Sequence, residues 1–371
     1  MKKTVLVAAT AVLAAAGVVS CKDPIGVPGP CQHRKVVFQG AAYAGNFRAY
    51  FGNLHAHTGY SDGAADPRSA FAYARDVAGL DFLAVTDHHE FVSDEALADT
   101  IRQALAESRP GRFVALAGFE WSHGFDRANG RLYNHINVFG TPRTMPKLEA
   151  SDLAGFYCHL LALPDGAFGQ FNHPSYRKPP LETNHWDDYK YDAYVDARMT
   201  LFEAGKGDYA AEKGYIKALE AGWHVSPVSN QDNHHADWGT ANSSRAGVWA
   251  EGLSLVAVLK ALREMRTFST TDGNATIRLM AEGRYWMGSV LKRAGAVPLR
   301  VEAFDPDPGE AFVKVELFAK GGKPIEVLTV RSPGRLTRDW TVNPTGSGYY
   351  FARITQADGD ELLSAPIWIE R

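Results

Sequence analysis

The sequence predicts an α/β fold that ends in a smaller all-β unit. Between residues 46 and 274, short apolar runs alternate with segments of helical periodicity. This alternation is typical of parallel strands with helices outside them, in a barrel or an open sheet. From residue 275 to residue 371 there are only short alternating runs separated by Pro- and Gly-rich turns. That second pattern predicts a small C-terminal β-sandwich.

Two helix starts are marked by capping residues. Asp66-Pro67 offers an N-cap and a first-turn proline, and the helix that follows ends at Gly79. Ser93 precedes two acidic residues, which favour a helix N-terminus. In chain order, the expected elements are a strand at 48–56, the first helix, a strand at 81–86, the second helix, strands at 113–119 and 132–139, a helix at 151–163, strands at 167–171 and 199–202, a helix at 209–221, a strand at 224–228 and a helix at 253–266.

The composition excludes several classes of protein. The 371 residues include 39 Lys and Arg against 42 Asp and Glu, which gives a formal net charge of −3. Domains that bind nucleic acid through charge are usually strongly basic, so we expect no nucleic-acid partner. Three cysteines are too few for a disulfide framework, and no C-x-x-C pair suggests a thiolate zinc site.

Residues 1–20 have the pattern of an export signal. Lys2 and Lys3 precede an apolar run from residue 5 to residue 19, which is too short for a membrane span. The segment Val18-Val19-Ser20-Cys21 resembles a bacterial lipobox, in which the cysteine is acylated. Plain secretion with cleavage near the same place is the alternative.

Acylation of Cys21 would attach the protein to a membrane through a lipid anchor alone. Residues 21–45 would then form a tether, and we expect the protein in the periplasm or on the outer surface. These compartments permit disulfides. Cys31 and Cys158 are therefore a candidate pair, with two buried free thiols as the alternative.

Histidines and acidic residues cluster where the predicted strands end. His55 and His57 end the first strand, and residues i and i+2 of a strand point to the same side, so both imidazoles can reach one cation. Each such residue alone has an ordinary structural explanation, but the carboxyl ends of parallel strands meet at one face. Similar residues follow the later strands, in Asp87-His88-His89-Glu90, Glu120, Asn134-His135, Asn172-His173 and Asp232-Asn233-His234-His235, so we expect one metal-rich pocket at these strand ends.

These residues lie in motifs that resemble the PHP (polymerase and histidinol phosphatase) superfamily. The ordered motifs are Leu54-His55-Ala56-His57-Thr58, Ser61-Asp62-Gly63, Thr86-Asp87-His88, Asn172-His173-Pro174 and Asp232-Asn233-His234. The surroundings of Glu120 and His135, and two segments near the C-terminus, are similar to the CehA/McbA-type branch. Over residues 48–371 the resemblance implies a distorted seven-stranded relative of the TIM barrel, spanning 46–274, with a trinuclear metal centre and a β-domain at 275–371.

The resemblance also implies a role for each ligand. It places Glu120 between two cations, as a catalytic residue together with Asp232. Asp87 would either orient His88 or bind metal. The implied sets are His55, His57, Glu120 and Asp232 for a first cation, Glu120, His135 and His173 for a second, and Asp62, His88 and His234 for a third.

Arg245 follows the last of these motifs, in Ser243-Ser244-Arg245-Ala246-Gly247. A guanidinium there would be able to clamp a phosphate oxygen, which would make Arg245 a catalytic residue. A surface salt bridge is the equal alternative.

The ligand types indicate the chemistry. Imidazole and carboxylate groups suit Zn²⁺, Mn²⁺ or Fe²⁺, and adjacent cations lower the pKa of a bridging water. We expect a phosphoesterase that cleaves a small organic phosphate mono- or diester through attack by a metal-bridged hydroxide. One alternative is a carbamate, amide or ester hydrolase, because the resembling branch is associated with carbaryl hydrolysis. Another is a surface lipoprotein that binds a glycan or a partner without catalysis.

Overall fold

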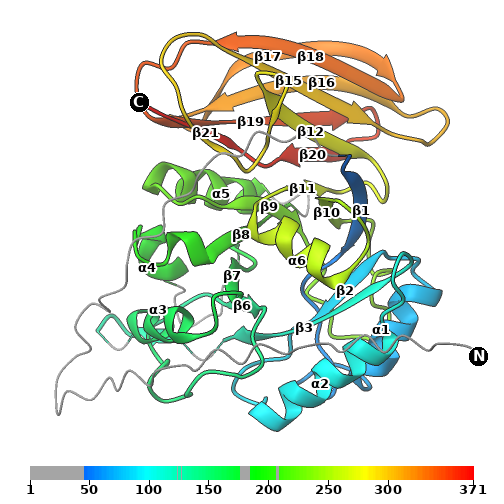
Figure 1. Cartoon of the computed structure of the whole chain (residues 1–371), viewed down its shortest axis with the longest axis vertical. Helices are drawn as coiled ribbons and strands as arrows, with labels where there is room; N and C mark the ends of the chain where they lie inside the picture. The colour runs from blue at the N-terminus through cyan, green and yellow to red at the C-terminus, as the bar shows by residue number, and fades with distance from the viewer. Residues whose placement is uncertain (1–45, 123, 127, 176–183, 206–208) are drawn as a thin grey trace, which may run out of the picture.

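The computed structural model describes residues 46–122, 124–126, 128–175, 184–205 and 209–371, and it is a mixed α/β structure with one large sheet (Figure 1). Its first part contains β1 (Arg48–Asn53), α1 (Pro67–Asp76), β2 (Phe82–Val85), α2 (Asp94–Glu107), β3 (Val114–Trp121), β4 (Phe125–Asp126), β5 (Arg131–Leu132), β6 (Ile136–Phe139), α3 (Leu153–Ala162), β7 (Phe168–Phe171), α4 (His185–Tyr189), a 3-10 helix (Asp196–Arg198), β8 (Met199–Gly205), α5 (Tyr209–Ala221), β9 (Ser226–Ser229), β10 (Arg245–Ala250), α6 (Leu255–Arg263) and β11 (Thr267–Thr270).

Both predicted helix caps are confirmed. The Asp66 side chain accepts a hydrogen bond from the Ser69 backbone N–H at 2.8 Å, and Pro67 is the first residue of α1. The Ser93 hydroxyl accepts one from the Ala96 N–H at 3.2 Å at the start of α2. These bonds satisfy backbone donors that have no partner inside the helix.

The strands of the α/β part do not all run in one direction. The order along the large sheet is β11-β10-β1-β2-β3-β6-β7-β8-β9, with parallel pairs β1–β2, β2–β3, β7–β8 and β8–β9. The expectation of parallel strands was wrong for β6, which is antiparallel to both β3 and β7. The amino end of β6 therefore lies at the same edge as the carboxyl ends of its neighbours.

The segment that follows β9 returns to the segment that follows β1. The described residues contain no ladder between β9 and β1, but an isolated parallel bridge joins Ala56 to Asn233. The Leu54 N–H also donates to the Asn230 side chain at 2.7 Å. A buried core cluster takes side chains from the end of β1 and from β2, β3, β6, β7, β8 and β9. These side chains include Leu54, Phe82, Leu116, Phe139, Phe168, Leu201 and Val228. The seven-stranded barrel stays a prediction.

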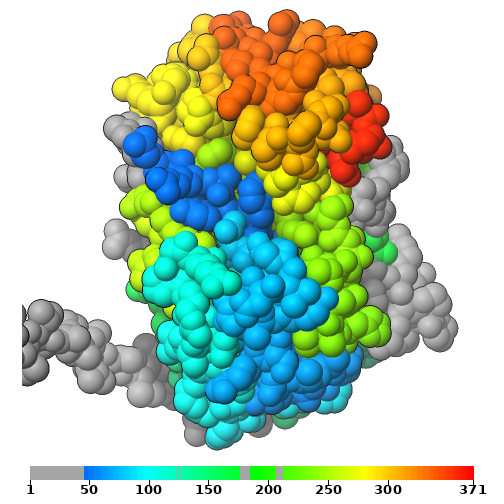
Figure 2. Space-filling view, turned by 90° about the vertical axis from the view of Figure 1, so that its right-hand side faces the viewer, coloured from blue at the N-terminus to red at the C-terminus, as the bar shows by residue number. Residues whose placement is uncertain are grey.

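The C-terminal part contains strands alone, as predicted. They are β12 (Thr276–Ala281), β13 (Tyr285–Trp286), β14 (Val290–Lys292), β15 (Val297–Phe304), β16 (Ala311–Ala319), β17 (Lys323–Pro333), β18 (Arg335–Val342), β19 (Gly348–Gln356), β20 (Glu361–Ser364) and β21 (Ile367–Glu370). A four-stranded sheet, β13-β12-β15-β18, shares a core cluster with residues of β16, β19, β20 and β21. Figure 2 shows the C-terminal part of the chain, in yellow to red, gathered at one end of the molecule.

The C-terminal strands join the α/β part without a break in hydrogen bonding. β20 pairs antiparallel with β11, which pairs with β10, which pairs with β1. The Arg353 guanidinium on β19 contacts Glu212 of α5 at 2.5 Å and Glu316 of β16 at 2.7 Å. The proposed boundary at residues 274 and 275 lies between β11 of the large sheet and β12 of the four-stranded sheet, and it stays a prediction.

The predicted export signal, Cys21 and Cys31 lie outside the described residues. Cys158, on α3, is disulfide-bonded. No helix among the described residues is long and apolar enough to cross a membrane.

Candidate metal centre

The segment after β1 forms the deepest part of the site. The His57 N–H donates to the Asn233 carbonyl at 2.8 Å, which holds the His55–His57 segment against the chain that follows β9. The Nε2 atoms of the two imidazoles lie 3.1 Å apart, and both rings are buried. This is the geometry that the i, i+2 spacing predicts.

Glu120, at the end of β3, lies at the centre of the cluster and is fully buried. Its Oε1 atom is 3.0 Å from His55 Nε2, 3.2 Å from His135 Nδ1 and 3.2 Å from His173 Nε2. His135 directly precedes antiparallel β6, and His173 follows parallel β7, so strands of opposite direction bring both imidazoles to the same carboxylate.

The second oxygen of Glu120 faces the outer part of the cluster. Glu120 Oε2 is 2.9 Å from His88 Nδ1 and 3.4 Å from His57 Nε2. Glu120 Oε2 and His88 Nδ1 are buried, yet neither makes a hydrogen bond of acceptable geometry. A buried polar atom without a hydrogen bond is costly, and a shared cation is one way to satisfy two facing lone pairs.

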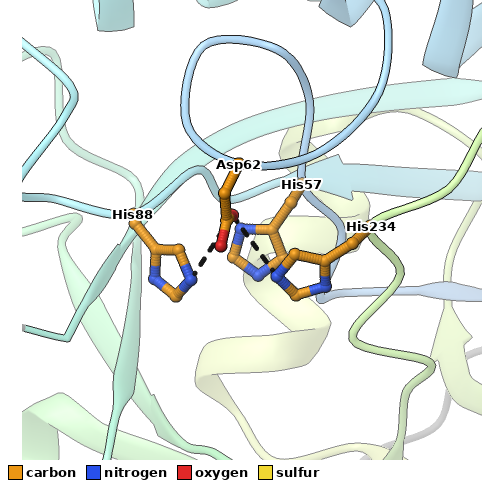
Figure 3. Close-up of side chains that lie close together, drawn as sticks. All are labelled: His57, Asp62, His88 and His234. Carbon is orange, nitrogen blue, oxygen red and sulfur yellow. Dashed lines mark ion pairs between the residues drawn. The ribbon is translucent and has the colours of Figure 1, made fainter.

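Four residues form the outer part, from three separate segments of the chain (Figure 3). Asp62 Oδ1 lies 3.6 Å from His88 Nε2 and 3.4 Å from His234 Nε2. The His57 ring stacks on the His234 ring, with centroids 4.1 Å apart. One carboxylate and three imidazoles facing a common point are a ligand set that divalent transition metals accept.

Asp232 connects the inner and outer parts. Its Oδ1 atom is 3.2 Å from both His55 Nε2 and His57 Nε2, and 3.8 Å from His234 Nδ1. The backbone of Asp232 is left-handed, with φ 50°. Non-glycine residues rarely adopt this conformation, and it concentrates at functional sites.

All nine predicted ligands thus lie in one cluster. Their candidate ligand atoms form four overlapping groups, each with atoms within 4.8 Å of one another: His57, Asp62, His88 and His234; His55, His57 and Glu120; His55, His173 and Asp232; and His88, Glu120 and His135. His55, His57, His88 and Glu120 each belong to two groups. The implied division into three ligand sets stays a prediction, because the shared residues allow other divisions.

The carboxylates of the cluster are ionised, and its imidazoles differ in pKa. Burial opposes protonation of His55, but Asp232, Glu120 and Glu203 raise its pKa well above the usual value. Although burial opposes ionisation, the nearby His55 keeps the pKa of both Glu120 and Asp232 well below the usual range. Burial lowers the pKa of His57 and His135, which favours the neutral imidazole that coordinates metals. Burial opposes protonation of His88 too, but Glu120 raises its pKa to about 9. A cation bound there would displace that proton.

The cluster is open on one side. The side chains of His55, His57 and Glu120 are 0% exposed, whereas that of Asp62 is 51% exposed. The side chains of His234 and Asp232 are 31% and 27% exposed. Solvent therefore reaches the cluster from the side of Asp62 and His234.

Arg245 is the first residue of β10 and belongs to none of the four groups. Its guanidinium donates to the backbone carbonyls of Gly239, Asn242 and Ser244 at 2.9, 2.9 and 2.8 Å. It therefore holds the loop after His234, and its role as a phosphate clamp stays a prediction.

Asp87, which was expected to orient His88 or to bind metal, holds a neighbouring turn and belongs to none of the four groups. Its Oδ1 atom accepts hydrogen bonds from the Thr58 N–H and the Ser61 hydroxyl, both at 2.6 Å, and its Oδ2 accepts from the Thr58 hydroxyl at 2.7 Å. Asp87 thereby fixes the turn that carries Asp62.

Asn172 stood in a motif without an assigned role, and Glu203 was missed from the sequence. Asn172 donates to Glu120 Oε1 at 2.8 Å. Glu203, on β8, lies behind His55, with Oε1 2.9 Å from His55 Nδ1. The available signal was an acidic residue inside the otherwise apolar run Met199–Gly205, which calls for a buried partner.

No family model and no curated protein matches the chain. Among solved structures, a two-domain protein from Bacteroides vulgatus that contains a predicted PHP-like metal-dependent phosphoesterase is similar over 87% of this chain and 95% of its own, with 17% identity and a TM-score of 0.48. A lytic polysaccharide monooxygenase from Jonesia denitrificans is similar over 24% of this chain and 62% of its own, with 18% identity and a TM-score of 0.18. At these scores neither likeness carries an argument about this chain.

Proposed function

We propose that this protein is a metal-dependent hydrolase of PHP type, a phosphoesterase that cleaves a small organic phosphate mono- or diester. The observation that carries the proposal is the overlap of the four groups, in which residues such as Glu120 and His57 are shared. Overlap of this kind suits cations held side by side, and paired cations are common in enzymes that cleave phosphate esters. Three divalent ions, Zn²⁺, Mn²⁺ or Fe²⁺, are part of the proposal.

Bound cations would supply an activated water and neutralise charge that develops on a phosphoryl group. The residues of the chain supply the rest. Glu120 presents one oxygen to the inner imidazoles and the other to His88 and His57. It would therefore help to hold two neighbouring cations. Asp62 and His234 form the accessible rim on which the ester is received.

A substrate panel tests the proposal. Protein freed of metal with a chelator and reloaded with Zn²⁺ or Mn²⁺ is assayed with bis(p-nitrophenyl) phosphate, p-nitrophenyl phosphate and a naphthyl carbamate. We expect hydrolysis of at least one phosphate ester, and loss of that activity in Asp232→Asn. Asp165→Asn is the matched control, because the Asp165 side chain is fully exposed in an ion pair with Arg198.

Turnover of the carbamate alone would replace the phosphoesterase with a carbamate or amide hydrolase that uses the same site. No hydrolysis with either metal would favour the non-catalytic binding lipoprotein. Full activity of Asp232→Asn would show that hydrolysis does not take place at this site.

Export and acylation at Cys21 belong to the same proposal. Labelling of cells with a fatty-acid analogue tests it, with Cys21→Ser as the control. A label on wild-type protein that Cys21→Ser lacks supports the anchor, and an unlabelled wild type contradicts it.

A further inference from the structure

We infer that Glu203 is a positioning residue for the metal centre, one that fixes His55 and His173 together and thereby sets the affinity of the group His55, His173 and Asp232 for its cation. The inference rests on the proposed metal centre and adds a residue that belongs to none of the four groups. Glu203 is 5% exposed and lies on β8, behind the ligands as seen from the open side.

One carboxylate reaches two ligand-bearing segments. Glu203 Oε1 is 2.9 Å from His55 Nδ1, and Glu203 Oε2 accepts the backbone N–H of His173 at 2.5 Å. The first contact orients a side chain, and the second fixes the backbone of a residue with φ 29°. Both imidazoles belong to the group that also contains Asp232.

The contact to His55 decides which ring nitrogen faces the cation. A carboxylate oxygen accepts, so His55 Nδ1 carries the hydrogen that it donates to Glu203. The other nitrogen, Nε2, then points at Glu120 and Asp232, at 3.0 and 3.2 Å. A ligating histidine whose second nitrogen is held by a carboxylate is fixed in tautomer and ring orientation.

Two more described residues donate to Glu203. Asn230 and Gln170 donate to Oε1 at 3.0 and 3.2 Å. The Asn230 amide is oriented by its own oxygen, which accepts the Leu54 N–H, so its nitrogen is left for Glu203. Among these described contacts, Oε1 accepts from three donors and Oε2 from the His173 N–H.

This arrangement predicts what an amide does at position 203. In Glu203→Gln, the amide oxygen stays where three donors converge, and the NH₂ group meets the His173 N–H. Donor then faces donor, so the His173 backbone loses its anchor while His55 keeps a neutral acceptor. Loss of such outer contacts typically weakens metal binding about 10- to 100-fold.

The test is a calorimetric titration of Zn²⁺ into chelator-treated wild type, Glu203→Gln and Glu316→Gln. Glu316 is the matched control, since it is also 5% exposed but lies in the C-terminal strands beside Arg353. We expect Glu203→Gln to bind at least one cation about 10- to 100-fold more weakly, and Glu316→Gln to bind as wild type does. The melting temperature of each metal-free protein is measured alongside, because a merely structural role would lower that value and leave the affinity unchanged.

Wild-type affinity in a folded Glu203→Gln would overturn the inference and leave the proposed function intact. A wild type that binds no cation would overturn both. If Glu203→Gln does not fold, Glu203→Asp takes its place, because it keeps the charge but withdraws the carboxylate from one or both anchors. Affinity equal to wild type in that variant overturns the inference as well.

Discussion

Replacement of Asp87 tests how the turn that carries Asp62 is held. In Asp87→Ala, the backbone N–H and the hydroxyl of Thr58 lose their acceptor, and Thr58 is 0% exposed. A buried donor left without a partner costs about 1–3 kcal/mol, so the two together lower the free energy of unfolding by about 2–6 kcal/mol. Ser61 adds little, because it is only half-buried and can turn to water.

Asp87→Asn should be far milder. Its amide oxygen can still accept the Thr58 N–H, and its NH₂ can donate to the Thr58 hydroxyl, so we expect a loss of about 1 kcal/mol. The matched control is Asp81→Ala, at the opposite end of β2, where one N–H, that of Phe51, loses its acceptor. Urea unfolding of chelator-treated protein measures all three. An Asp87→Ala protein no less stable than Asp81→Ala would refute this account of the turn.

Three further outcomes are expected. Asp66→Ala removes the N-cap of α1 and costs about 1 kcal/mol in urea unfolding at neutral pH. Hydrogen bonding by Ser69 lowers the pKa of Asp66 below 3.8. The ionised Asp66 therefore stabilises the folded protein above that pH, and this stabilisation is lost as the pH falls through the lowered pKa. The difference in stability between Asp66→Ala and wild type then shrinks in acid. Chelation should lower the melting temperature. Zn²⁺ at 100 times the Kd of one site should restore about 2.7 kcal/mol of the free energy of unfolding. An unchanged melting temperature would count against bound metal. Arg245→Ala removes donors from three backbone carbonyls and should cost about 1–3 kcal/mol in urea unfolding, whereas wild-type stability would show that the loop does not depend on this side chain.

The sequence carried most of the local information about the site. Capping side chains at Asp66 and Ser93 placed two helix starts correctly, because caps act within three residues of the helix end. The i, i+2 spacing of His55 and His57 placed both rings on one side for the same local reason.

The direction and pairing of the strands could not be predicted from local sequence patterns. The direction of β6 depends on which strands it pairs with, and an antiparallel strand has no separate local signal over four residues. His135 nevertheless reaches the site, because the amino end of an antiparallel strand lies beside the carboxyl ends of its neighbours. Strands β10 and β11 were missed. They flank a strongly periodic helix, and their pairing with β1 and β20 spans distant parts of the chain.

Supporting residues were the least predictable part of the site. The run that contains Glu203 shows a buried acid, but not which side chain lies opposite it. Asp87 was noticed, yet its partners are in a turn 29 residues earlier. Such contacts are properties of the folded arrangement.

The central claim is that nine residues far apart in the sequence hold divalent cations together. Anomalous diffraction at the zinc edge, from crystals of protein reloaded with Zn²⁺, tests it most directly. The account predicts adjacent peaks among His55, His57, Glu120 and their neighbours in the four groups. A map without peaks there, or with zinc bound only elsewhere, would contradict it.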